Sequence, residues 1–288
     1  AGEIDAPTIY YSALFGGPEF MKDPRVIGAS LGYVTGEAPW QRQIDATTDL
    51  AAAVAAARGT GAQAIKLYGA LDAATVKRIG VEAARQHIRL IGHGNVFPAK
   101  ASDLIAAGAK YLAHAPYLVW DAMPASTDFT KRAAGDFAGV PADGPAMTAL
   151  LRSMAANDVS LNPTLWVLAE GGAKTDPTGL RNAWANTFTR RARELGVPIA
   201  AGVDSLFANG DPLPLMHKEL EMLVTGAGFT PLQAVAAGTK GAAHGIGVDD
   251  RRGSIAIGQS ADLLLLDADP TANIRNTRAI RTVIHAGK

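Results

Sequence analysis

The chain has 288 residues, of which 48% are hydrophobic, so it can bury a core of barrel size with a small appendage. Its 27 basic and 27 acidic residues balance, and no basic stripe favours nucleic acid or an anionic membrane as a partner. Cysteine is absent, which excludes disulfides and thiolate metal sites. The compartment of this soluble chain stays open, either cytoplasmic or exported after signal removal.

The longest apolar run, residues 255–266, is interrupted by Gly258, Gln259 and Asp262. It is too broken to cross a bilayer, and no transmembrane helix is predicted.

The first half of the chain alternates short apolar runs with helical patterns. A strand rich in β-formers is predicted over Thr8–Leu14, and glycine and proline mark a long irregular loop over residues 16–39. An alanine-rich helix capped by Thr47 or Thr48 is expected to end at Arg58. Further strands are predicted at 62–67, 88–93 and 110–114, with helices at 72–86 and 102–107.

An irregular stretch follows, Tyr117–Pro145, which is either a lid or pocket wall over the C-terminal face of the fold or a mobile surface excursion. Helices are predicted at 147–156, 180–195, 213–224 and 231–237, with strands at 159–165 and 197–203. The tail differs in kind, because 253–257, 261–267 and 280–286 are predicted to be short antiparallel strands outside any βα rhythm.

Three successive apolar runs end in side chains that can bind a metal: Lys66, His93 and His114. Their separations suit a strand, a return helix and two loops, so these side chains are expected at the C-terminal ends of parallel strands. In an α/β barrel, that face carries the chemistry. Only six barrel strands are counted, so either the sheet is an open six-stranded variant or two strands come from elsewhere.

The C-terminal third carries three motifs: GVDS at 202–205, HKELEMLVTGAGFTPLQAVAAGTKGAA at 217–243 and GSIAIGQSADLLLLDADPTANI at 253–274. With these motifs the chain resembles the C-terminal two-thirds of a metal-dependent amidohydrolase, of the imidazolonepropionase-like branch that includes prolidase-like dipeptidases. The resemblance implies an α/β fold, an incomplete TIM-like (β/α) barrel lacking its first two strands. Residues 1–245 would supply barrel strands three to eight, and 246–288 the C-terminal strands of a small β-sandwich.

The resemblance also implies roles. Lys66 matches the strand-four lysine that is carboxylated and bridges two metals, while His93 and His114 match the histidine ligands of strands five and six. Asp204 matches the strand-eight aspartate that contacts a metal and takes a proton from the attacking water. The His-x-His pair of strand one is absent, which implies that one metal subsite cannot form from this chain alone.

The chemistry of these residue types agrees with those roles. Neutral imidazoles suit zinc, and one or two divalent ions, with zinc preferred, are expected. An unmodified lysine is a cation with a pKa of roughly 10.4, and carboxylation would turn Lys66 into an anionic oxygen donor. Each residue also has a structural alternative: His93 and His114 as hydrogen-bonded core histidines, and Asp204 as a helix N-cap.

Two further residues are candidates for binding substrate. Tyr68 lies two positions past Lys66 and either faces the same mouth or packs at its rim. His217 opens a predicted helix and either contacts substrate or supports the site from behind. The remaining charged candidates are expected to be surface, packing or solvated groups: His87, His244, His285, Arg25, Lys131 and Arg132.

The leading hypothesis is a metal-dependent hydrolase of an amide, peptide-like or cyclic amide bond in a small molecule, through water activated by the metal; an ester or lactone stays open. One alternative is a degenerate barrel that binds a ligand without catalysis. Another is a half-enzyme whose partner chain carries the missing His-x-His strand. Because two absent strands leave unpaired edges, a second chain or an oligomer is expected to complete the barrel.

Overall fold

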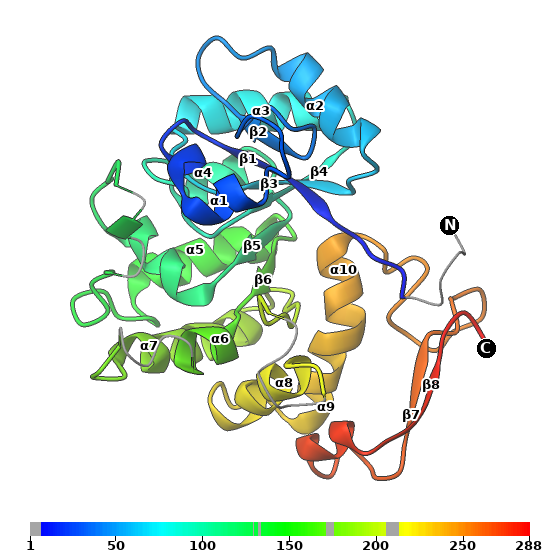
Figure 1. Cartoon of the computed structure of the whole chain (residues 1–288). Helices are drawn as coiled ribbons and strands as arrows, with labels where there is room; N and C mark the ends of the chain where they lie inside the picture. The colour runs from blue at the N-terminus through cyan, green and yellow to red at the C-terminus, as the bar shows by residue number, and fades with distance from the viewer. Residues whose placement is uncertain (1–6, 129, 132–133, 171–175, 206–212) are drawn as a thin grey trace.

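Six short strands form a single parallel sheet at the centre of the molecule (Figure 1). The computed structural model describes residues 7–128, 130–131, 134–170, 176–205 and 213–288. The strands are β1 Ser12–Gly16, β2 Gln41–Gln43, β3 Ala64–Leu67, β4 Arg89–Gly92, β5 Tyr111–Ala113 and β6 Ser160–Asn162, in the spatial order β2-β1-β3-β4-β5-β6. Every pairing is parallel, so all the strands end at one edge, and the predicted α/β architecture is confirmed.

Helices cover one face of this sheet. Alternate residues of each strand point to opposite faces, so every second side chain is directed towards these helices. Ala13, Ile65, Leu67 and Leu112 are buried in the core against these helices. The bounds in this part of the chain are α1 Pro24–Gly28, α2 Leu50–Gly59, α3 Ala73–Arg85, α4 Ala101–Ala106, α5 Pro145–Ala156, α6 Leu165–Glu170 and α7 Leu180–Glu194, with the 3₁₀ helices η1 Phe20–Lys22 and η2 Ala115–Ala122. No helix of the described chain is long and apolar enough to cross a bilayer.

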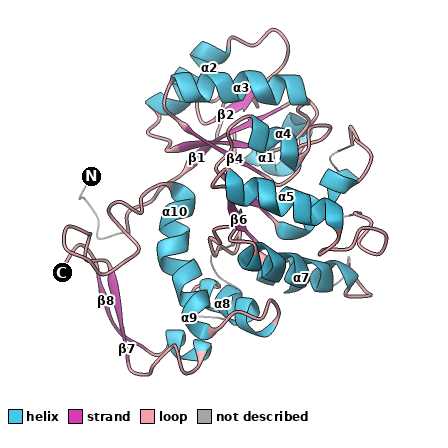
Figure 2. Cartoon of the chain, turned by 180° about the vertical axis from the view of Figure 1, so that it is seen from behind, coloured by secondary structure: helices cyan, strands magenta, loops and turns pink. Residues whose placement is uncertain are grey.

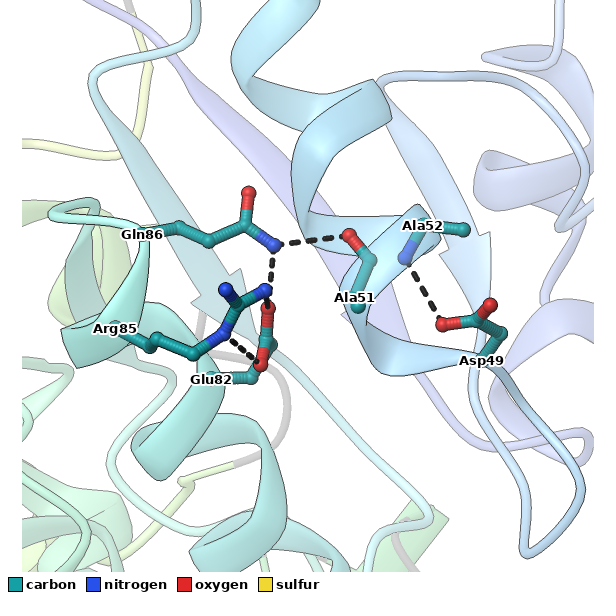
Figure 3. A network of polar contacts seen from close by, with 6 residues as sticks. All are labelled: Asp49, Ala51, Ala52, Glu82, Arg85 and Gln86. Carbon is teal, nitrogen blue, oxygen red and sulfur yellow. Dashed lines mark hydrogen bonds and ion pairs between the residues drawn. The ribbon is translucent and has the colours of Figure 1, made fainter.

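Polar contacts fasten α2 to α3 on this helical layer (Figure 3). Asp49 caps α2 by accepting a hydrogen bond from the backbone N–H of Ala52 at 3.0 Å. At the end of α3, Gln86 donates to the carbonyl of Ala51 at 2.9 Å and also contacts Glu82. Arg85 donates two hydrogen bonds, of 2.9 and 2.6 Å, to the same Glu82 carboxylate. These hydrogen bonds are the main cause that lowers the pKa of Glu82 to about 2.

The strands differ from the sequence prediction at both ends of the sheet. The first strand begins at Ser12 rather than Thr8, and Gln41–Gln43 adds an unpredicted parallel strand on its free side. Residues 197–203, predicted to be a strand, make only one isolated bridge, Leu161 to Ile199. Pro198 lacks a backbone N–H, which limits pairing in that segment.

The stretch 117–145 starts inside the core. Helix η2 buries Leu118, Val119 and Trp120, and the Trp120 ring lies edge-on to Phe97 at 4.9 Å. This part of the stretch is therefore a packed wall rather than a surface excursion. Phe129 and Arg132, which belong to the same stretch, lie outside the described residues.

The C-terminal part forms a helical group and a two-stranded antiparallel ribbon. Its elements are α8 Met216–Thr225, α9 Pro231–Ala236, the π-helical turn η5 Ala237–Gly241, α10 Ala242–Ile246, β7 Leu263–Leu266, η6 Ile274–Arg278 and β8 Ile280–Ile284. Figures 1 and 2 show the ribbon of β7 and β8 set apart from the sheet, with α10 between them. The predicted tail strand at 253–257 is wrong, since this segment forms turns and loop with Ile255 and Ile257 exposed.

Candidate functional site

Three neighbouring strands bring Lys66, His93 and His114 to the same edge of the sheet. Lys66 is the third residue of β3, His93 directly follows β4 and His114 directly follows β5. The backbone N–H of His93 donates to the carbonyl of Leu67 at 3.0 Å, which extends the β3–β4 ladder to the histidine. The two imidazole centroids lie 4.6 Å apart, and both side chains are buried.

Tyrosine rings flank this pair. Tyr68 stacks on Phe20 at 4.4 Å and lies against His93 at 4.1 Å. On the other side, Tyr117 stacks on His93 at 5.2 Å and meets His114 edge-on at 5.4 Å. Aromatic pairs at these separations are attractive, so the His93 ring is fixed between two neighbours.

His114 and Asp204 face one another across the mouth of the sheet. The Nε2 atom of His114 is 4.0 Å from Oδ2 of Asp204, which is too long for a hydrogen bond. Both residues have a positive φ, 68° for His114 at the end of β5 and 57° for Asp204 after residues 197–203. The histidine side chain is 5% exposed and the aspartate 53%, so a buried imidazole opposes a solvent-facing carboxylate.

A threonine fixes the far side of the His114 ring. Nδ1 of His114 lies 2.9 Å from Oγ1 of Thr164, which follows β6. When the ring donates Nδ1–H to that hydroxyl, the lone pair of Nε2 is directed towards Asp204.

Burial lowers the pKa of Lys66, and the nearby negative charge of Asp204 partly opposes this effect. Its Nζ lies 5.3 Å from the centroid of the Tyr68 ring. The lowered pKa increases the neutral amine fraction, which is the form that reacts with electrophiles and binds metals.

A cavity of about 290 Å³ runs along the face of the sheet opposite the helical layer, where Gly245 and Ile246 of α10 also line it. Its wall takes alternate residues of the strands, among them Ala64 and Lys66, then Arg89 and Ile91, as the two-residue strand period requires. His114 and Asp204 border the same cavity. The wall includes two buried atoms without a hydrogen-bond partner, Oδ1 of Asn162 and Nε of Arg89. This face is therefore incompletely filled, and it holds two polar atoms that nothing in the described chain satisfies.

The other predicted site residues lie outside the described lining of this cavity. His217 is buried on α8 with Nδ1 3.0 Å from Oγ1 of Thr277, and the described lining of the cavity does not include it. Arg25 pairs with Asp23 at 2.6 Å and also forms a hydrogen bond with the Tyr68 side chain, so it lies next to the site, whereas Lys131 pairs with Asp128 at 3.8 Å. Among the remaining histidines, His87 is exposed, His244 pairs with Asp158 and Asp249, and His285 pairs with Asp262.

Two residues of the site were not recognised in the sequence. Tyr117 follows His114 by three residues in the run AHAPY, and Thr164 ends the run SLNPT after β6. An aromatic residue three positions after a candidate ligand was the available signal for Tyr117. The sequence held no comparable signal for Thr164, which meets His114 only in the folded chain.

The site holds metal-type donors, but they do not form a ready-made cluster. Among the described residues, no group of three or more His, Cys, Asp or Glu side chains is arranged to hold a metal ion. The nitrogen and oxygen donors of His93, His114 and Asp204 are nevertheless of the type that zinc takes.

Comparison with known proteins shows what the chain is similar to. Residues 179–288 match the model of the amidohydrolase family. The imidazolonepropionase of Syntrophobacter fumaroxidans is 30% identical over 154 residues, which are 50% of this chain and 35% of that protein. This chain thus matches only about a third of the length of its curated relative.

Two solved structures share the fold over almost the entire chain. A Xaa-Pro dipeptidase with bound methionine in its active site superposes with a TM-score of 0.69 at 20% identity, covering 99% of this chain and 68% of that one. An ochratoxinase from A. niger superposes with a TM-score of 0.72 at 22% identity, covering 100% of this chain and 66% of that one. The expected α/β fold is confirmed, and its six parallel strands agree with an incomplete barrel.

Proposed function

We propose that this chain, which belongs to the amidohydrolase superfamily, is the site-bearing part of a hydrolase that cleaves carbon–nitrogen bonds in small molecules. The observation that carries the proposal is the meeting of His93 and His114, beside Lys66 and opposite Asp204, at the C-terminal edge of the sheet. An amide, a peptide-like bond or a cyclic amide is the proposed substrate, with an ester or lactone open to the same chemistry. The dipeptidase among its structural neighbours supports the peptide-like choice.

The proposed cofactor is one or two divalent metal ions, with zinc preferred. His93, His114 and Asp204 would hold it, and Lys66 would join them after carboxylation by CO₂. The gap of 4.0 Å between His114 Nε2 and Asp204 Oδ2 supports this, since two donors separated by that distance suit a shared cation better than each other. A bound ion would act as a Lewis acid that polarises the carbonyl and lowers the pKa of water.

The side chains of this chain have separate proposed roles in the reaction. The solvent-facing carboxylate of Asp204 accepts a proton from the attacking water and delivers it to the departing nitrogen. Tyr68, beside His93, contacts the substrate from one wall of the mouth. His217, predicted as a substrate contact, lies outside the described lining of the cavity with its Nδ1 3.0 Å from Oγ1 of Thr277, and its proposed role is to support the site from behind.

The chain is proposed to act together with a second segment, supplied by another chain or another copy. The incompletely filled face of the sheet supports this, because the described residues leave Asn162 Oδ1 and Arg89 Nε without partners there. The proposed division is a barrel part over 1–245 and sandwich strands over 246–288.

One observation favours the alternative of binding without catalysis. The described residues hold no ready three-ligand group of His, Cys, Asp or Glu. Without carboxylation of Lys66 or a ligand from elsewhere, the site would bind a substrate-like molecule and leave it intact.

Metal analysis of purified variants tests the proposal. His93→Ala and His114→Ala are each expected to lose bound zinc and hydrolysis of dipeptides, because each removes an imidazole donor. His87→Ala is the matched control, since His87 is an exposed histidine directly before the strand that leads to His93. Unchanged zinc stoichiometry in both test variants would refute the site.

A further inference from the structure

Helix α8 carries a completely buried carboxylate, that of Glu219. Its two oxygens accept hydrogen bonds from the backbone N–H groups of Leu165 and Trp166, at 2.9 and 2.8 Å. These are the first two amides of α6, which begins directly after Thr164. Burying a carboxylate costs free energy unless its oxygens are hydrogen-bonded, and these two backbone N–H groups supply the hydrogen bonds.

The segment that Glu219 holds is the one that contacts His114. Thr164 has a φ of 50°, a conformation that a β-branched residue adopts only when its surroundings enforce it. The two hydrogen bonds to the next two amides supply such a constraint from α8. On the other side, the N–H groups of His114 and Ala115 donate to the carbonyls of Asn162 and Pro163, at 2.8 and 3.2 Å.

The contacts form a chain from the buried carboxylate to the imidazole. Glu219 fixes the start of α6, the start of α6 fixes the backbone of Thr164, and the Thr164 hydroxyl lies 2.9 Å from Nδ1 of His114. We infer that Glu219 is a positioning residue, which acts through Thr164 to hold His114 with Nδ1 protonated and the Nε2 lone pair towards Asp204. The inference deepens the proposed function and rests on it for the role of Nε2 as a metal donor.

Two opposing effects set the charge state of Glu219. Burial raises its pKa to about 7, while the two backbone hydrogen bonds oppose the rise by favouring the carboxylate. A glutamine at this position would offer one acceptor oxygen and would turn an N–H₂ group towards the second amide. Glu219→Gln is therefore expected to release one of the two contacts without changing the size of the side chain.

The test is imidazole NMR of the histidine-labelled protein without metal. In the wild type, His114 is expected as a single neutral tautomer protonated at Nδ1. In Glu219→Gln it is expected to become a mixture of tautomers. Glu221→Gln is the matched control, because Glu221 lies two positions further along α8 and pairs with Arg275 at 3.4 Å instead of with α6. If Glu219→Gln does not fold, Glu219→Asp withdraws the carboxylate by one methylene and is expected to give the same mixture.

Zinc titration by calorimetry provides the second readout. Loss of a residue that orients a metal-binding histidine typically weakens affinity by about 10–100-fold, which is the expected effect of Glu219→Gln. Thr164→Val removes the hydroxyl and is expected to match it, and the double variant is expected to lose no more than either single variant. Additive losses would overturn the route through Thr164.

The two readouts separate the two proposals. A wild-type protein that binds no zinc would overturn the metal proposal, and the tautomer of His114 would still decide the role of Glu219. An unchanged His114 tautomer in a folded Glu219 variant whose Leu165 and Trp166 amide signals have moved would overturn the role of Glu219 alone.

Discussion

Strands β5 and β7 both contain leucine, yet their leucine side chains differ in how deeply they are buried. Leu112 in β5 is completely buried, whereas Leu264 and Leu265 in β7 are 53% and 49% exposed. β5 lies inside a parallel sheet with a helical layer on one face, while β7 pairs only with β8. A two-stranded ribbon has no second layer of its own, so apolar content alone does not bury a strand.

The contrast extends to function. The candidate site lies where buried strands fix their terminal residues, as with His93 between Tyr68 and Tyr117. The ribbon instead exposes a row of apolar side chains including Val283, at 65%. Exposed apolar surface of this kind is typical of a site that binds another protein surface. The edge of the sheet therefore favours a catalytic or ligand-binding role, and the ribbon favours association with a partner.

The largest expected effect is at the mouth of the sheet. Asp204→Asn keeps the shape of the side chain and removes the proton acceptor, so dipeptide hydrolysis by the zinc-loaded protein should fall by roughly 10²–10⁴-fold. Asp267→Asn, on the ribbon, should leave the rate unchanged, because its carboxylate pairs with Arg281 far along the tail. Full turnover of Asp204→Asn with zinc bound would contradict the assignment.

Truncating one leucine in each region tests the packing difference directly. Leu112→Ala should lower the free energy of unfolding by about 2–5 kcal/mol, because it opens a cavity in the core. Leu265→Ala should change it by no more than about 0.5 kcal/mol. Urea unfolding measures both. Equal losses would mean that the ribbon is packed in solution as tightly as the sheet.

A pH-dependent contact joins the sheet to the C-terminal part. His244 on α10 lies 3.0 Å from Asp249 and 3.0 Å from Asp158, which precedes β6. The hydrogen bond to Asp249 is the main cause of the raised pKa of His244. The folded state thus binds the proton more tightly than the unfolded state. This stabilisation is complete below the unfolded pKa, about 6.5, and is lost as pH rises through the higher folded pKa.

The variant His244→Gln should remove that part of the pH dependence. Because the contact is partly exposed, the difference in unfolding free energy from the wild type should be below about 1 kcal/mol. Glu219 contributes a separate pH dependence, because its raised pKa, about 7, makes the fold less stable as pH rises from about 4.5. This contribution is the same in the wild type and in His244→Gln, so it cancels in the difference between their unfolding free energies. A difference that grows with pH instead would contradict the prediction.

The smallest effect on stability is expected on the ribbon surface. Val283→Thr should change the unfolding free energy of the chain by less than about 0.5 kcal/mol, since the side chain is already exposed. If a second copy covers the ribbon, the same change should shift a concentration series in sedimentation towards the monomer. An unchanged distribution in a self-associating wild type would exclude the ribbon as the contact.

Much of the sheet was predictable because most of its strands end short apolar runs bounded by turn residues. The strands leading to Lys66, His93 and His114 were predicted within a few residues of their observed bounds. The strand Gln41–Gln43 was not, because its sequence is entirely polar. Gln41 is buried there by its contacts, accepting from Ser30 at 2.9 Å and donating to the carbonyl of Val26 at 2.7 Å.

The sequence by itself determined the alternation of strands and helices, and with it the edge at which Lys66, His93 and His114 lie. These follow from periods of two and 3.6 residues and from the requirement for a crossover between parallel strands. Only the tertiary structure decided how the side chains are held. Thr164 reaches His114 from 50 residues away, and Glu219 reaches Leu165 from 54 residues away. Such contacts depend on how separate elements pack, and no local pattern in the chain records that packing.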